Sequence, residues 1–240
     1  MTERTLKNRN LNRTFAAIST ALVFDASVRL DVNLRVAPAG IHPLLAASRL
    51  AGRVLPVQHY GSVDVFLEAF GTAELGDVLV IDNHGRIDES CVGDLTALEA
   101  QGSGLSGMVI WGCHRDTAEL LQVRLPVFSY GSCPAGPLQQ RPRDATALEW
   151  ATFGSFNVGR DDVVFADDDG VIFIREVDAE KVLSIARDIW QTERRQAEAV
   201  RNGKKLREQL RFDEYLAKRV NDQSYTFRQH IRALGGAIEQ

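Results

Sequence analysis

The chain has 240 residues, of which 45% are hydrophobic and 25% charged, so it is long and apolar enough to bury the core of a soluble domain. Its formal net charge of −4 gives no general attraction to nucleic acid, which argues against a nucleic-acid-binding protein. No apolar run approaches the roughly 20 residues that span a bilayer, and the N-terminal residues lack the apolar core of a signal peptide. We therefore expect a cytoplasmic protein without a membrane segment.

The first third of the chain alternates helical and extended patterns. Residues 1–13 are polar and basic, which predicts a loosely ordered arm, whereas apolar side chains recur at helical spacing over residues 14–30. Proline and glycine favour a loop over residues 36–43. Residues 51–59 then predict a strand, and residues 63–70 predict a helix with one apolar face.

Two buried strands follow, each ending in polar residues. The β-branched run 78–81 predicts a strand covered on both faces, and Asp82-Asn83-His84-Gly85 comes directly after it. The apolar residues 108–111 predict a second strand that ends at Gly112. Because strands of an α/β sheet bring their polar ends to one edge, Asn83 is a candidate substrate contact, although a simple turn fits residues 83–85 equally well.

The helix predicted from Gly93 to Gln101 offers an anion site. Its first backbone amides have no partner within the helix, and the helix dipole favours a negative charge there. We expect a substrate carboxylate at the residues that begin this helix, which are Gly93, Asp94, Leu95 and Thr96.

The strongest candidate site lies after the second strand, where Arg115, Asp116 and Glu119 fall within five residues. If a helix starts here, the two carboxylates point the same way. A hard divalent cation prefers such oxygen ligands, and the neighbouring arginine suits a carboxylate or carbonyl. The alternative is a solvated helix start, because acidic residues are favoured in a first turn.

Cysteine and histidine residues show no metal-binding spacing. We interpret the three cysteines as reduced thiols, and a nucleophilic role would require a base facing Cys91 or Cys113. His84 and His114 are candidates to line a pocket, whereas the other histidines, His42, His59 and His230, are expected at surface or structural positions.

The C-terminal half begins with short strands and ends in helices. Residues 162–166 and 171–174 predict a hairpin around an acidic turn, and a charged pattern over 179–210 predicts a long helix. We expect that helix to pack across a neighbouring subunit. Residues 211–240 form two short amphipathic pieces, either for oligomer packing or as a lid. The predicted division is a domain of residues 1–210 and an extension of residues 211–240.

Gly93 and the group Arg115-Asp116-Thr117-Ala118-Glu119 resemble the signature of the RraA-like family, in which a glycine is followed, after a spacer, by Arg-Asp-x-x-Glu or Asp. The strand entry Gly76-Asp77-Val78 and the hairpin Asp167–Gly170 support the resemblance, which covers residues 18–203. Two departures stand out. Residues 60–64 replace the family's Pro-Gly-Asp-Asn, and Asp94 replaces its usual Glu or Asn.

The resemblance implies an α/β sandwich with a swivelling β/β/α core. It implies a divalent-metal aldolase acting on a small anionic 2-oxo acid such as 4-hydroxy-4-methyl-2-oxoglutarate, releasing pyruvate and also decarboxylating oxaloacetate. Family members assemble as homotrimers or homohexamers with sites between subunits. A non-catalytic regulator of ribonuclease on the same scaffold is the alternative, but that branch typically lacks the full Arg-Asp pair. A methyltransferase is disfavoured because no nucleotide-binding glycine motif is present.

Site roles also follow from the resemblance. Asp116 would bind Mg²⁺ or Mn²⁺, with Glu119 ordering water around the ion, and Arg115 would stabilise the enolate oxygen. A glutamate of the long helix, Glu193 or alternatively Glu198, would reach the site of the adjacent subunit.

Overall fold

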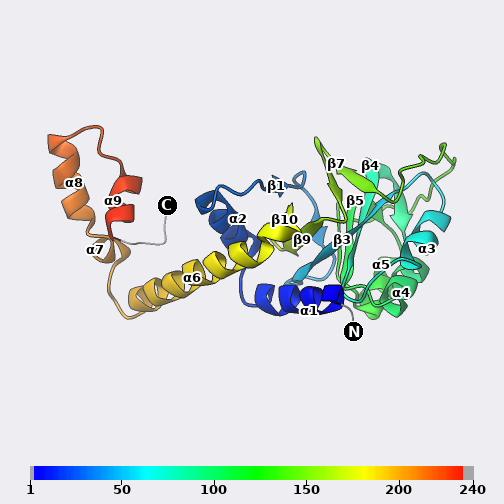
Figure 1. Ribbon diagram of the computed structural model, residues 1–240, viewed down its shortest axis with the longest axis horizontal. Helices are drawn as coiled ribbons and strands as arrows, with labels where there is room; N and C mark the ends of the chain where they lie inside the picture. The colour runs from blue at the N-terminus through cyan, green and yellow to red at the C-terminus, as the bar shows by residue number, and fades with distance from the viewer. Residues whose placement is uncertain (1–2, 235–240) are drawn as a thin grey trace.

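The computed structural model describes residues 3–234, with side chains from residue 7 onward. Its main element is an eight-stranded mixed sheet in the order β1-β10-β9-β3-β4-β5-β6-β2 (Figure 1). Strand β3 (Leu50–Gln58) lies near the middle, pairing antiparallel with β9 on one side and parallel with β4 on the other. None of the described helices is long and apolar enough to cross a membrane.

The parallel half of the sheet carries the predicted site. Each strand is followed by a helix that leads into the next strand, which explains why the strands run parallel. The elements are α3 (Asp64–Phe70), β4 (Val78–Val92), α4 (Asp94–Gly102), β5 (Gly107–His114), α5 (Thr117–Val123) and β6 (Val127–Ser129). Strand β2 (His42–Pro43) pairs antiparallel with β6 at the edge.

The antiparallel half contains β9 (Asp162–Asp167), β10 (Gly170–Arg175) and β1 (Arg35–Val36). The predicted hairpin is confirmed, since Asp167 pairs with Gly170. Helices α1 (Glu3–Phe15), α2 (Thr20–Arg29) and α6 (Glu176–Arg201) pack on this half.

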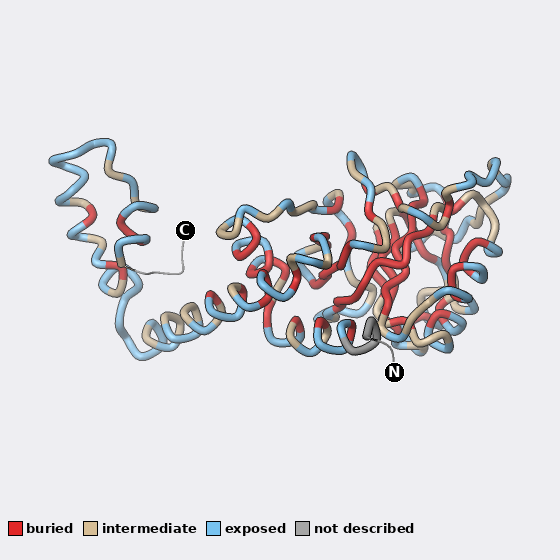
Figure 2. Tube along the Cα trace, viewed as in Figure 1, coloured by how far each residue is buried: buried red, intermediate tan, exposed pale blue. Residues whose placement is uncertain are grey.

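Side chains that point alternately to the two faces of the sheet divide the core into separate clusters. Leu79 and Ile81 pack with residues of α3 to α5, whereas the intervening Val80 packs in a separate cluster with the small ribbon of β7 (Trp150–Phe153) and β8 (Phe156–Gly159). Successive side chains of a strand point to opposite faces, so helices cover one face of the sheet and the ribbon covers the other. Figure 2 shows the buried residues gathered along these strands.

The C-terminal helices stand apart from the sheet. Helix α6 leaves the body and ends at Arg201, followed by α7 (Leu206–Gln209), α8 (Phe212–Asn221) and α9 (Phe227–Leu234) at its far end (Figure 1). The predicted helix 179–210 is therefore too long. Its break coincides with Gly203, whose φ of 90° is a left-handed conformation that ends helices. The amphipathic pieces within 211–234 are observed as α8 and α9, residues 235–240 lie outside the described residues, and the domain division stays a prediction.

Two predictions near the N-terminus are corrected. The N-terminal arm is helix α1, in which Asn8, Leu11 and Phe15 form a buried stripe at helical spacing. The predicted helix 14–30 instead begins at Thr20, where the Ser19 hydroxyl accepts a hydrogen bond from the amide of Leu22.

The strands β4 and β5 are also longer than predicted. Neither the turn-like residues 83–85 nor Gly112 ends its strand, because bulges in β4 let its pairing with β5 continue to Val92.

We expect Asn8→Ala to destabilise the fold. The fully buried amide of Asn8 accepts from the Arg53 amide at 3.0 Å and donates to Asp77 Oδ1 at 2.9 Å, so its removal leaves buried polar groups unpaired. The free energy of unfolding, measured with urea, should fall by on the order of 3 kcal/mol. The exposed Asn10→Ala is the control and should change it little; equal effects of the two substitutions would contradict the assigned role of Asn8.

Candidate active site

Parallel pairing of β4 with β5 brings the two signature segments together. Val92 is paired with His114 at the ends of these strands, and the Arg115 amide donates to the Val92 carbonyl at 2.9 Å. Gly93 and Arg115 therefore begin adjacent loops at the same edge of the sheet. This is the edge at which open α/β sheets bind ligands.

Gly93 allows the carboxylate of Asp116 to lie against the backbone. A Cβ atom placed on Gly93 would be 2.2 Å from Asp116 Oδ2, so any other residue at position 93 would force the carboxylate to move. Asp116 itself has a left-handed backbone (φ 59°, ψ 44°) at the N-cap of α5. Such a conformation costs energy in a residue other than glycine and is concentrated at functional sites.

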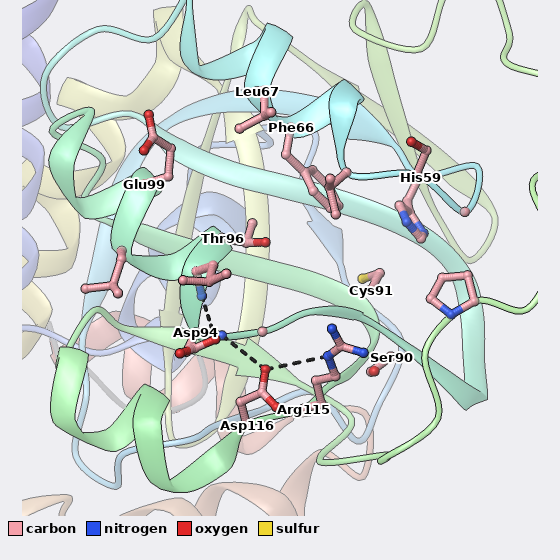
Figure 3. A pocket seen from close by; sticks show the side chains of 17 residues that line it. His59, Phe66, Leu67, Ser90, Cys91, Asp94, Thr96, Glu99, Arg115 and Asp116 are labelled. Atoms are coloured by element: carbon pink, nitrogen blue, oxygen red, sulfur yellow. Dashed lines mark hydrogen bonds and ion pairs between the residues drawn. The ribbon is translucent and has the colours of Figure 1, made fainter.

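These residues border a cavity of about 550 Å³ (Figure 3). Arg115, Asp116 and the first turn of α4 form its polar side. Its remaining walls come from the end of β3, helix α3 and strand β4, and include His59, Phe66, Leu67, Ser90 and Cys91. A cavity of this size accommodates a small organic acid.

The backbone amides at the start of α4, which were predicted to bind an anion, already have acceptors in part. The Asp94 amide donates to Asp116 Oδ2 at 3.4 Å, and the Leu95 amide donates to Asp94 Oδ1 at 2.8 Å. Among the described residues only the Thr96 amide of these three lacks an acceptor. Two of the three amides expected to receive a substrate carboxylate therefore already have an acceptor, because two nearby carboxylates occupy the positive end of the helix, and the anion site stays a prediction.

Arg115 reaches over the cavity beside the loop of residues 132–137, which contains two prolines and Gly136. Its Nε lies 3.5 Å from Asp116 Oδ2, and its side chain is 51% exposed. A Cβ atom on Gly136 would be 2.9 Å from Arg115 Nη1, so the loop of residues 132–137 packs closely against the guanidinium. This loop is fixed by Ser90, whose amide donates to the Ala135 carbonyl at 2.7 Å.

The other predicted site residues lie away from this cavity. Asn83 is fully buried beside His59, and Glu119 is exposed on α5. Glu193, on α6, lies near Asp25 and Arg29 of α2, and burial raises the pKa of its carboxyl. None of the three lines the cavity of its own chain. Their predicted roles at the metal or in a neighbouring subunit's site stay predictions.

His59 is the residue that the sequence analysis missed. It is 2% exposed, lines the cavity, and stacks on Phe66 with ring centroids 5.3 Å apart. Its Nδ1 lies 2.9 Å from Asn83 Oδ1. Burial is the main cause that lowers the pKa of this imidazole. In the sequence, only its position at the C-terminal end of the strand predicted over residues 51–59 could have indicated that it belongs to a ligand site.

The expectation that His84 and His114 line a pocket is corrected as well, whereas His42 is exposed and His230 is buried as expected. His84 is exposed in the bulged part of β4, and His114 is buried with Nδ1 2.7 Å from Ser129 Oγ; neither lines the cavity. Cys91 does line it, but burial raises the pKa of its thiol well above the usual range. A protonated thiol is a poor nucleophile, which weighs against cysteine catalysis.

The donor set of the site suits a hydrated hard cation. Asp116 supplies a carboxylate that packs against the backbone of Gly93 at the cavity wall. Mg²⁺ typically uses one or two carboxylates together with water and substrate oxygens. The described residues contain no cluster of three or more His, Cys, Asp or Glu side chains arranged for a metal. The arrangement therefore fits Mg²⁺ or Mn²⁺ shared with a ligand better than a closed structural metal site.

We expect the fold to lose stability on acidification. Burial lowers the pKa of both His59 and His114, so the unfolded chain binds more protons than the folded chain below about pH 6.5. The free energy of unfolding is therefore unaffected by the protonation of these histidines above that pH. It declines as the pH falls towards the pKa values that the two histidines have in the folded chain. Urea unfolding at pH 7.5 and 5.5 would measure it.

The double variant His59→Gln/His114→Gln should show a weaker pH dependence than the wild type, while the exposed His42→Gln should match the wild type. An unchanged pH dependence in the double variant would contradict this explanation.

Comparison with known proteins identifies the scaffold. Residues 20–173 match the model of the RraA-like family, described as Aldolase/RraA. The chain is 29% identical over 122 residues to a protein of Dechloromonas aromatica named "Putative 4-hydroxy-4-methyl-2-oxoglutarate aldolase", covering 51% of this chain and 74% of that one.

Solved structures agree with this match. An uncharacterized protein from Pseudomonas syringae pv. tomato has a TM-score of 0.70 and 25% identity, covering 83% of this chain and 96% of that one. RraAS2 of Streptomyces coelicolor, titled an unusual member of the RNase ES inhibitor RraA protein family, has a TM-score of 0.67 and 23% identity, covering 79% and 97%. From its matched sequence and its mixed sheet, the chain belongs to the RraA-like family.

Proposed function

We propose that the protein is a divalent-metal-dependent aldolase that cleaves a 4-hydroxy-2-oxo acid to release pyruvate. The observation that carries the proposal is the packing of the Asp116 carboxylate against Gly93, with Arg115 beside it in the same cavity. The names of relatives such as the one from Dechloromonas aromatica support this reaction class. A small 4-hydroxy-4-methyl-2-oxoglutarate-like acid fits the cavity in size.

Asp116 would hold Mg²⁺ or Mn²⁺, with Glu119 close enough in sequence to order its water. When bound, the ion supplies Lewis-acid stabilisation of the 2-oxo acid end of the substrate. The carboxylate of Asp116 already lies at the cavity wall, packed against Gly93 and beside the Arg115 guanidinium.

Arg115 would stabilise the negative charge that develops on the C2 oxygen. Its guanidinium lies beside the cavity and carries a permanent positive charge, so it favours the enolate over the neutral ketone. The substrate carboxylate would lie at the first turn of α4, near the unpartnered Thr96 amide. The side chain of Asp94 must turn away for the substrate carboxylate to reach the Leu95 amide as well.

We further propose that the active form is a homo-oligomer. The outer part of α6 extends away from the sheet (Figure 1), and exposed leucines surround the cavity, namely Leu67, Leu95 and Leu98. Apolar side chains at a cavity mouth suit a contact with another subunit. A trimer or hexamer in which Glu193 serves the adjacent site is the assembly that the family resemblance implies.

Pyruvate release from 4-hydroxy-4-methyl-2-oxoglutarate and from oxaloacetate tests the function. With Mg²⁺ present we expect turnover of both compounds, because both reactions pass through the pyruvate enolate. EDTA should abolish turnover and added Mg²⁺ should restore it. Asp116→Asn should lower kcat/KM by about 100-fold or more, since it removes the charged ligand.

Glu180→Gln, an exposed carboxylate on α6 outside the cavity, is the matched control and should keep wild-type activity. Turnover that is insensitive to EDTA, or that survives in Asp116→Asn, would refute the metal-dependent mechanism. No turnover of either compound would favour a binding role for the chain.

A further inference from the structure

The cavity contains a buried imidazole that the proposed function leaves unused. His59 closes the wall contributed by β3, and Arg115 approaches from the opposite loop (Figure 3). Resting on the proposed aldolase function, we infer that His59 is the catalytic base that removes the proton from the C4 hydroxyl of the substrate.

The contact with Asn83 assigns a tautomer and an orientation to the imidazole. Nδ1 lies 2.9 Å from Asn83 Oδ1, and because a carbonyl oxygen can only accept, Nδ1 carries the proton. Nε2 is then the unprotonated acceptor. It has no hydrogen-bond partner among the described residues, although the residue is 2% exposed and lines the cavity.

Surrounding contacts keep this arrangement rigid. The ring stacks on Phe66, and the His59 backbone accepts from Arg141 Nη2 at 3.2 Å and donates to the Asp82 carbonyl at 2.9 Å. Asn83 is wedged against Gly112, where a Cβ atom would lie 2.8 Å from the Asn83 Cβ. A base aimed by a second group that is itself fixed is the usual arrangement for proton transfer.

The surroundings of the ring as a whole favour the neutral imidazole. Burial lowers the pKa of His59 most, and the positive charge of Arg141 lowers it further, as does His84, while the Asn83 hydrogen bond and Glu89 raise it. His59 is therefore unprotonated at neutral pH, which is the form that accepts a proton.

Other groups in the cavity suit this task less well. Asp116 is assigned to the metal, and the Asp94 carboxylate accepts from the Leu95 amide at the start of α4. Glu99 is exposed on α4. The Cys91 thiol stays protonated because burial raises its pKa.

The proton balance closes within one turnover. Nε2 takes the C4 hydroxyl proton, the O–H electron pair forms the C4 carbonyl, and the C3–C4 pair becomes the pyruvate enolate. The imidazolium then gives its proton to C3 of the enolate, which yields pyruvate and restores neutral His59. Oxaloacetate decarboxylation forms the same enolate by loss of carbon dioxide; it has no hydroxyl proton to remove, and its enolate takes the C3 proton from water, so neither step needs His59.

The two substrates therefore separate this role from a structural one. In Mg²⁺-loaded His59→Gln, kcat for cleavage of 4-hydroxy-4-methyl-2-oxoglutarate should fall by about 100-fold or more, whereas oxaloacetate decarboxylation should keep its wild-type rate. The exposed His42→Gln should keep both activities. Retained decarboxylation would itself show that His59→Gln is folded.

A second variant tests the proton transfer by its pH profile. Asn83→Asp places a carboxylate on Nδ1, which stabilises the imidazolium and raises the pKa of His59. The rising limb of kcat/KM for cleavage should move to higher pH while the decarboxylation profile stays in place.

Equal losses of both activities in His59→Gln, full retention of cleavage, or an unmoved limb in Asn83→Asp would overturn the assignment while leaving the aldolase proposal intact. A wild type that turns over neither compound would overturn the proposed function, and the role of His59 with it.

Discussion

The close approach of the Asp116 carboxylate to the backbone of Gly93 is the constraint on which the site depends. It exists because parallel strands β4 and β5 end side by side, with Val92 paired to His114. The left-handed backbone of Asp116 then turns its side chain towards α4 instead of along α5. Sheet pairing, one glycine and one strained residue together place a carboxylate, a guanidinium and a helix N-terminus at a single cavity.

The rest of the fold supports this edge of the sheet. Strand β3 joins the antiparallel half to the parallel half, and its last residues deliver His59 to the cavity. Asn8 of α1 ties β3 to the segment that enters β4 through buried hydrogen bonds to Arg53 and Asp77. Residues far from the cavity thus help to fix the register of the strands that form it.

Much of this organisation could be predicted from the sequence. The β-branched run at 78–81 and the acidic hairpin at 167–170 have local patterns, and the fold and family they suggest are confirmed. Helix α1 was missed because a buried asparagine completes its apolar stripe, and only tertiary hydrogen bonds make that position a core position.

The site shows the same division between local and long-range information. Gly93, Arg115 and Asp116 could be named together from the resemblance to the family signature, and the structure brings them together. The hydrogen bonds from the first α4 amides to the carboxylates of Asp94 and Asp116 could not be predicted, because they depend on the side-chain conformations of residues in two separate segments. His59 could not be distinguished from a structural histidine, because its partner Asn83 lies on another strand.

The most direct test of this account is a pair of glycine substitutions at the two ends of α4. Gly93→Ala would place a Cβ atom 2.2 Å from Asp116 Oδ2, whereas a Cβ atom on Gly102 would have no neighbour within 4 Å. Metal-dependent pyruvate release should fall by about 100-fold or more in Gly93→Ala, because a misplaced catalytic group typically costs this much, and should be unchanged in Gly102→Ala. Wild-type activity in a folded Gly93→Ala protein would show that the close approach is not required, and would contradict the account.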